Sequence, residues 1–118
     1  MWYTRLDPKR KEDVKKIIKD GQVEFAQGGW VAPDEACPNY EDFILNVQLG
    51  HQFLQREFGA RPTVAWNVGV YGHSAAAQAL FADFGLEAQF FDHMLNEPKG
   101  RREVNHSQTF LWEPFARN

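Results

Sequence analysis

Two adjacent carboxylates and a histidine are the side chains of this sequence whose types suit proton transfer or the binding of a polar ligand. Asp34 and Glu35 follow one glycine-containing stretch, and His73 lies in a second, directly before Ser74. A carboxylate accepts hydrogen bonds from hydroxyl groups, and an imidazole exchanges its proton near neutral pH. Each also has a structural interpretation, because adjacent carboxylates often cap the next helix and a histidine in a turn often bonds to the backbone.

Trp30 and Trp66 are candidates for stacking on a sugar, because the face of an indole ring suits the apolar face of a hexose. Trp66 lies inside an apolar run, and we expect it in the core. Trp30 follows the glycine pair 28–29, so that a core position and a ligand contact both stay open for it. The predicted substrate-binding residues are therefore Trp30, Asp34 and His73.

The other histidines and the cysteine do not indicate a metal site. His51 falls within an expected helix and has a structural interpretation. His93 and His106 are too far apart in the sequence to indicate a pair of ligands. With Cys37 as its one cysteine, the sequence has neither an internal disulfide nor a cysteine-based zinc site. We expect no metal ligand and no cofactor on this chain.

Three stretches combine helical spacing of apolar residues with a capping residue before them or a glycine after them. They are residues 8–20 after Asp7, residues 39–58 before Gly59, and residues 75–84 between Ser74 and Gly85. A polar stretch, 96–107, has the composition of a loop or of an irregular helix.

Short apolar or alternating runs between these helices predict strands at 22–26, 62–68 and 86–91, with 108–112 as a less regular fourth. Strands that alternate with such helices are typical of βαβ units. We therefore expect one α/β domain over residues 1–118. It would be an incomplete β/α barrel-like segment of three to four mostly parallel strands with two to three helices. So few strands cannot close a barrel of about eight, and their unpaired edges predict other protein subunits as partners.

Composition and charge exclude two classes of partner. The 118 residues carry a formal net charge of -3, and no basic stripe indicates a nucleic-acid interface. No run approaches the roughly 20 apolar residues that span a bilayer. The N-terminus has no signal-peptide pattern. We expect neither nucleic acid nor a membrane span, and an intracellular or organellar location.

Three motifs lie in order along the chain: GGWVAPDEA at 28–36, GHQFL at 50–54 and WNVGVYGHS at 66–74. In these motifs the sequence resembles the class II α-mannosidases of glycoside hydrolase family 38. That family has GGW-x-x-x-DEA, GH-x-FL and W-x-I-D-P-F-G-H-S patterns at nearly this spacing. The FF pair at 90–91 and the FLW triplet at 110–112 extend the resemblance over nearly the whole chain.

The resemblance implies a segment of the family's N-terminal β/α barrel, in which an aspartate both binds zinc and attacks the anomeric carbon. Gly69 occupies the matching position, and Val70 and Tyr71 also differ from the family pattern. A retaining glycosidase needs a carboxylate nucleophile and a second carboxyl about 5 Å away, and glycine supplies neither. The family's other zinc ligands, a His-x-Asp pair and a distant histidine, have no match in this sequence. We expect no catalytic residue here and no zinc bound by this chain.

Three functions stay open on these grounds. We favour a non-catalytic α-mannosidase-like protein that serves as a structural or interaction subunit of a larger assembly, because position 69 and both of its neighbours have changed. The first alternative is a segment of a zinc-dependent retaining α-mannosidase that hydrolyses mannose-containing glycans in the secretory lumen. The second is a mannose-binding module without catalysis, built around Trp30, Asp34 and His73.

Overall fold

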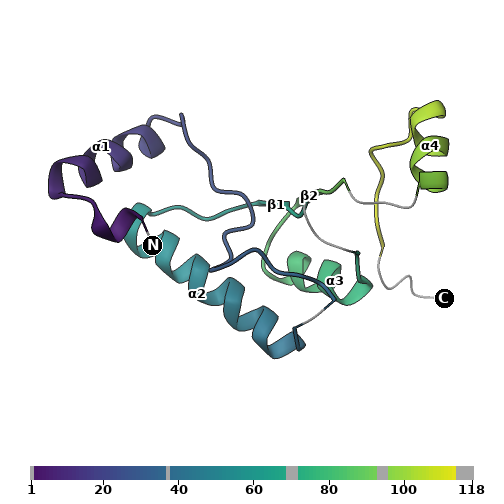
Figure 1. The fold of residues 1–118 in the computed structure, drawn as a ribbon, viewed down its shortest axis with the longest axis horizontal. Helices are drawn as coiled ribbons and strands as arrows, with labels where there is room; N and C mark the ends of the chain where they lie inside the picture. The colour runs from purple at the N-terminus through teal and green to yellow at the C-terminus, as the bar shows by residue number, and fades with distance from the viewer. Residues whose placement is uncertain (1, 37, 69–71, 93–95, 114–118) are drawn as a thin grey trace.

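A computed structural model describes residues 2–36, 38–68, 72–92 and 96–113. The chain is elongated, measuring 51 × 33 × 23 Å, with α1 at one end and α4 at the other (Figure 1). The elements in chain order are a 3₁₀ turn η1 (Tyr3–Arg5), α1 (Pro8–Lys19), α2 (Tyr40–Phe58), β1 (Val64–Trp66), α3 (Ala75–Asp83), β2 (Ala88–Phe90) and α4 (Asn96–Val104).

The helix ends follow the local signals of the sequence, and the three predicted helices are confirmed as α1, α2 and α3. The side chain of Asp7 accepts a hydrogen bond from the backbone N–H of Arg10 at 3.0 Å, which caps α1. Gly59 ends α2 in the left-handed conformation, with φ of 65°. Ser74 caps α3 by accepting from the backbone N–H of Ala77 at 3.0 Å.

Strands β1 and β2 form a parallel pair, and α3 connects them. The register places Ala65 beside Gln89 and Trp66 beside Phe90. A helix that links two parallel neighbours is a βαβ unit, as the alternating pattern predicts. The α/β class is therefore confirmed, and the assignment of the chain to an incomplete β/α barrel-like segment stays a prediction.

The expected strand at 22–26 is wrong, because these residues have no regular structure. The stretch reaches β1 only at its end, where the N–H of Gln27 donates to the carbonyl oxygen of Val64 at 2.6 Å. Gln27 and Gly28 both have positive φ, 58° and 74°. Consecutive left-handed residues turn the chain away from an extended path, and a ladder with β1 cannot form there.

The less regular strand at 108–112 is also wrong, because these residues have no regular structure. They line a groove of about 510 Å³ together with residues of α3, β2 and α4. The ring of Phe110 packs instead under the guanidinium of Arg102 from α4, 4.0 Å from the ring centroid. Within the described ranges the chain thus has two strands rather than three to four, and four α-helices rather than two to three, since the stretch at 96–107 contains α4.

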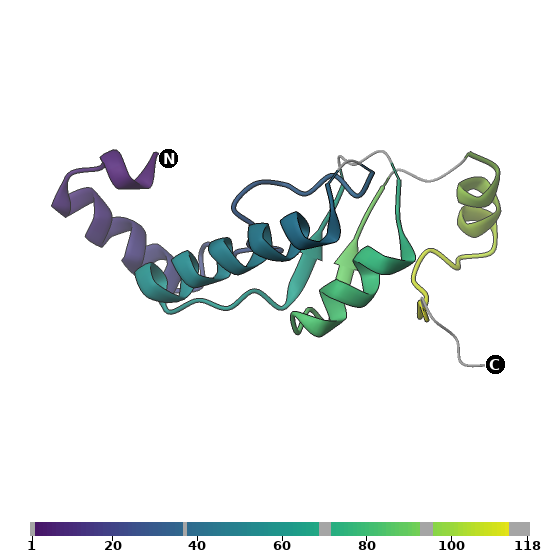
Figure 2. The ribbon, with the colours of Figure 1, turned by 90° about the horizontal axis from the view of Figure 1, so that it is seen from below.

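The two-stranded sheet has one covered face and one open face. Helices α2 and α3 lie on the same side of the strands (Figures 1 and 2). The core between them consists of Phe43, Val47, Ala65, Ala77, Phe81 and Leu86. On the open face, the rings of Trp66 and Phe90 lie 5.8 Å apart and are 58% and 57% exposed. The expected core position of Trp66 is therefore wrong, because its side of the strand has no helix over it.

No helix among the described residues is both long enough and apolar enough to cross a membrane.

Replacement of a phenylalanine should cost far more on the covered face than on the open face. Phe81→Ala removes a side chain that is 3% exposed, and we expect it to lower the free energy of unfolding by about 3–5 kcal/mol. The control, Phe90→Ala, removes mainly a ring contact with Trp66 and should cost about 1 kcal/mol. Urea denaturation of the whole chain measures both values. Equal losses would contradict a core built only on the helix side of the sheet.

Candidate functional site

The carboxylate of Glu35 is the centre of a small polar cluster at the carboxyl end of β1. Its side chain is 2% exposed. One oxygen, Oε1, accepts a hydrogen bond from Nδ2 of Asn67, and the other, Oε2, accepts from the backbone N–H of Ser74, both at 2.6 Å. Nδ1 of His73 lies 3.6 Å from Oε1. Hydrogen bonds to a carboxylate are strong, and a buried carboxylate requires such partners.

This cluster joins two secondary-structure elements. Asn67 directly follows β1 and is buried, and its own N–H donates to the carbonyl oxygen of Phe90 in β2 at 2.9 Å. Ser74 is the N-cap of α3, where a negative charge is favourable because the first N–H groups of a helix are unpaired. Glu35 therefore fastens the end of β1 to the start of α3. Gly69, the predicted counterpart of the catalytic aspartate, belongs to the connection between them but lies outside the described residues.

The structure places Asp34 and His73 at this cluster. Oδ1 of Asp34 accepts a hydrogen bond from the N–H of Ala36 at 3.0 Å, so that Asp34 shapes the turn that presents Glu35. It does not cap α2, whose N-cap residue is Asn39. The ring of His73 lies between Glu35 and Phe91, with a centroid distance of 4.7 Å to the latter. Binding of a substrate by Asp34 and His73 stays a prediction.

Trp30 packs on helix α2. Its ring stands perpendicular to that of Phe53 with centroids 5.8 Å apart, and the backbone N–H of Trp30 donates to the carbonyl oxygen of Asn46 at 3.0 Å. Half of the Trp30 side chain is exposed, so it has a packing contact and a free surface at once. The three predicted substrate-binding residues therefore divide into a pair next to Glu35 and a tryptophan on α2.

Two anchoring residues, Glu35 and Asn46, are not among the predicted substrate-binding residues. The sequence indicates Glu35 only as one of two adjacent carboxylates, and it gives no indication of Asn46. The amide of Asn46 makes two hydrogen bonds with the backbone of Val31, accepting from its N–H and donating to its carbonyl oxygen, each at 2.9 Å. The sequence contains one signal for the role of Glu35. Asn67 at the end of a predicted strand and the helix cap Ser74 both carry N–H donors that need an acceptor.

The glycines of two motifs meet where α2 passes under the loop at 28–30. A Cβ on Gly50 would collide with the carbonyl oxygen of Gly28, and it would lie 2.6 Å from the carbonyl carbon of Gly29 and 2.7 Å from the nitrogen of Trp30. The next residue, His51, donates from Nε2 to the carbonyl oxygen of Gln27 at 2.7 Å. The GHQFL and GGW motifs are therefore two sides of one backbone contact, and the structural interpretation of His51 fits this geometry.

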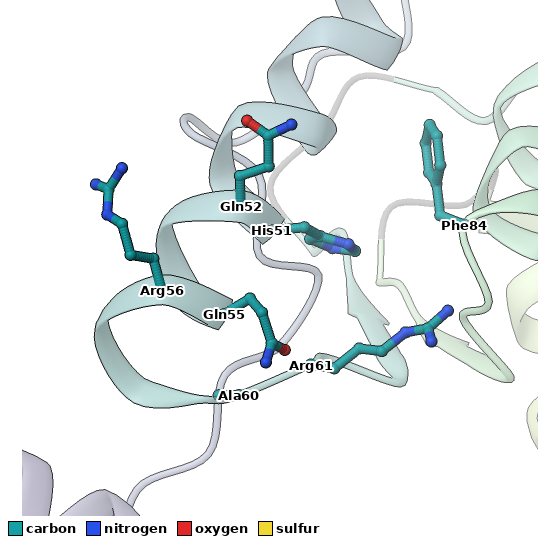
Figure 3. A pocket seen from close by; sticks show the side chains of 7 residues that line it. All are labelled: His51, Gln52, Gln55, Arg56, Ala60, Arg61 and Phe84. Atoms are coloured by element: carbon teal, nitrogen blue, oxygen red, sulfur yellow. The ribbon is translucent and has the colours of Figure 1, made fainter.

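A separate depression of about 460 Å³ lies near the amino end of β1. Figure 3 shows the side chains of His51 and Arg61 pointing towards Phe84, while Arg56 points away. None of the predicted substrate-binding residues lines this depression. It therefore does not belong to the candidate site at the other end of the strand.

The described residues do not fit a zinc site. Among them, no three side chains of the types His, Cys, Asp and Glu converge on one point. Both oxygens of Glu35, the carboxylate nearest to an imidazole in this cluster, already accept hydrogen bonds from Asn67 and Ser74. A catalytic zinc takes about three protein ligands. In this cluster Glu35 therefore acts as the hydrogen-bond acceptor for Asn67 and Ser74.

The contact at Gly50 predicts an unusual response to alanine. In an open helix, Gly→Ala stabilises by up to about 1 kcal/mol, and we expect this at Gly100 in α4, where a Cβ would meet nothing within 4 Å. Gly50→Ala should instead destabilise the chain by about 1–3 kcal/mol, because the loop must move off the helix. Thermal and urea unfolding of the two variants measure the difference. A stabilised Gly50→Ala chain would rule out the close backbone approach.

The sequence comparisons bear on this arrangement. Residues 1–118 match the family described as the glycosyl hydrolases family 38 N-terminal domain. An alpha-mannosidase of Arabidopsis thaliana is 37% identical over 113 residues, which are 95% of this chain and 11% of that protein. A probable alpha-mannosidase of the same plant is 34% identical over 112 residues, or 94% and 11% of the two chains. The lysosomal alpha-mannosidase of Felis catus is 36% identical over 117 residues, or 98% and 12%.

The chain thus spans 11–12% of the length of these relatives. The family match covers the glycine contact, the Glu35 cluster and the βαβ unit alike, and it confirms the resemblance found in the three motifs. The chain belongs to the glycosyl hydrolase family 38 N-terminal domain family.

Proposed function

We propose that this chain is a segment of the catalytic domain of an α-mannosidase that acts on mannose-containing glycans. The observation that carries the proposal is the match of all 118 residues to the family, with relatives named as alpha-mannosidases at 34–37% identity. This proposal replaces the structural-subunit function favoured by the sequence, because the relatives resemble the chain from end to end and not only in its motifs.

The half-covered sheet supports the proposal. Trp66 and Phe90 leave more than half of their side-chain surface open on one face of β1 and β2. Large exposed aromatic side chains that lie side by side are typical of a surface that another part of a protein covers. In the proposed function, the remainder of the catalytic domain covers this face, and the Glu35 cluster holds the end of β1 towards the site.

The role proposed for this segment is scaffolding of the active site. A retaining glycosidase forms a covalent bond between a carboxylate and the sugar, and water then breaks that bond. Glycine at position 69 has no oxygen with which to form it. The segment therefore contributes position and hydrogen bonds through Glu35, Asn67 and Ser74, while any nucleophile must come from outside these residues.

A non-catalytic function is the second candidate, and one observation favours it. Gly69 stands where the family resemblance expects the nucleophile, and its neighbours Val70 and Tyr71 differ from the family pattern as well. In this second case the chain keeps the family scaffold and joins other protein subunits, which cover the open face of the sheet. The two candidates differ in whether the polypeptide hydrolyses an α-mannoside.

The native polypeptide distinguishes the two candidates. An antibody against residues 8–20 can isolate it under non-denaturing conditions, after which its length is measured on a denaturing gel and its hydrolysis of an aryl α-mannoside is assayed. The α-mannosidase proposal predicts hydrolysis by a polypeptide several times larger than 13.6 kDa. A 13.6-kDa chain among unrelated subunits, without hydrolysis, would overturn that proposal and support the second candidate.

The isolated polypeptide also tests the role of position 69. If it is active, sequencing of the peptide that carries a trapped covalent sugar should place the sugar outside residues 66–74. Attachment of the sugar within residues 66–74 would contradict the scaffolding role. It would also mean that the native polypeptide has an aspartate where this sequence has Gly69.

A further inference from the structure

We propose that Glu35 is a positioning residue, whose buried carboxylate holds the end of β1 at Asn67 against the start of α3 at Ser74. Its importance for catalysis rests on the proposed function, but the positioning itself is a property of this chain. The carboxylate of Glu35 is buried, it binds Asn67 and Ser74, and these contacts are separate from the hydrophobic core.

Glu35 holds both ends of the same connection. Asn67 lies just before residues 68–73, and Ser74 lies just after them. Each donates to a different oxygen of the carboxylate, at 2.6 Å. The sequence separations of 32 and 39 residues make these two bonds tertiary contacts rather than a local turn. A single side chain therefore bridges the end of β1 and the start of α3.

A carboxylate is suited to this role because both of its oxygens are acceptors. A glutamine at position 35 keeps one carbonyl oxygen and replaces the other with an NH₂ donor. That donor would face either the amide of Asn67 or the N–H of Ser74, and one of the two bonds is lost unless Asn67 rotates. A leucine of similar size removes both acceptors and leaves a buried amide and a backbone N–H without them, which is costly.

The effect should remain local because the cluster is distinct from the core. The buried apolar contacts of α2 with α3 involve Phe43, Val47 and Phe81, and none of them bonds to Glu35. Asp34, the neighbouring carboxylate, binds only the turn at Ala36 in the contacts described for its side chain. Asp34→Asn is therefore a matched control. It removes one negative charge next to the cluster, as Glu35→Gln does, but it leaves the acceptors of Asn67 and Ser74 in place.

Amide hydrogen exchange measured by NMR on the whole chain tests this inference. We expect Glu35→Gln to speed exchange at the Ser74 amide by at least about tenfold, and Glu35→Leu by about a hundredfold. The Ser74 amide proton should also move upfield in both variants, because it loses a bond to a charged acceptor. The amide proton shift of Val47, which is fully buried in α2, should stay unchanged in both variants, because the hydrophobic core is separate from the Glu35 cluster. Asp34→Asn should leave Ser74 unchanged.

Two outcomes would overturn the inference. A change in the Val47 amide shift as large as the change at Ser74 would mean that the substitutions rearrange the core and do not act at the ends of β1 and α3. Unchanged exchange and chemical shift at Ser74 in Glu35→Gln and Glu35→Leu would mean that the carboxylate does not bind there. If Glu35→Leu fails to fold, Glu35→Ala, which also removes both acceptors, decides. Because the assay needs no hydrolysis, its failure is distinguishable from failure of the α-mannosidase proposal.

Discussion

The close approach of two backbones, α2 at Gly50 and the loop at 28–30, is the constraint on which the placement of the site depends. With no side chain between them, the loop lies directly on the helix, and His51 and Asn46 can then reach its backbone on either side. The same contact brings Gln27 against the edge of β1. From this fixed point a few residues carry the chain to Glu35 and to the carboxyl end of the strand.

One face of the two-stranded sheet is packed within this segment, and the other face is exposed. Helices α2 and α3 bury one face against residues such as Val47 and Phe81, while Trp66 and Phe90 stay exposed on the other. At roughly 25 cal/mol per Å² of buried apolar surface, covering an aromatic pair is a substantial contribution to stability. In the proposed function, the remainder of the catalytic domain covers these exposed rings.

The helices could be predicted because their signals are local. Asp7 with Pro8, Gly59 and Ser74 act within a few residues of the ends that they define. The strands were harder to predict, because alternation shows which residues could pair but not whether a neighbour is present. Residues 108–112 have the pattern, yet the ring of Phe110 packs with Arg102 of α4. Trp66 was misplaced for a related reason, since an apolar run does not reveal which face of its strand is covered.

The candidate site was predictable in its parts but not in its centre. Motif spacing singled out Asp34 and His73, and the structure gathers both around Glu35, whose partners are 32 and 39 residues away. Contacts of that separation cannot be read from periodicity or capping rules. The bonds of Glu35 go to Asn67 and Ser74, which lie before and after the connection that contains Gly69. The geometry of the cluster is therefore compatible with both the α-mannosidase proposal and the non-catalytic candidate.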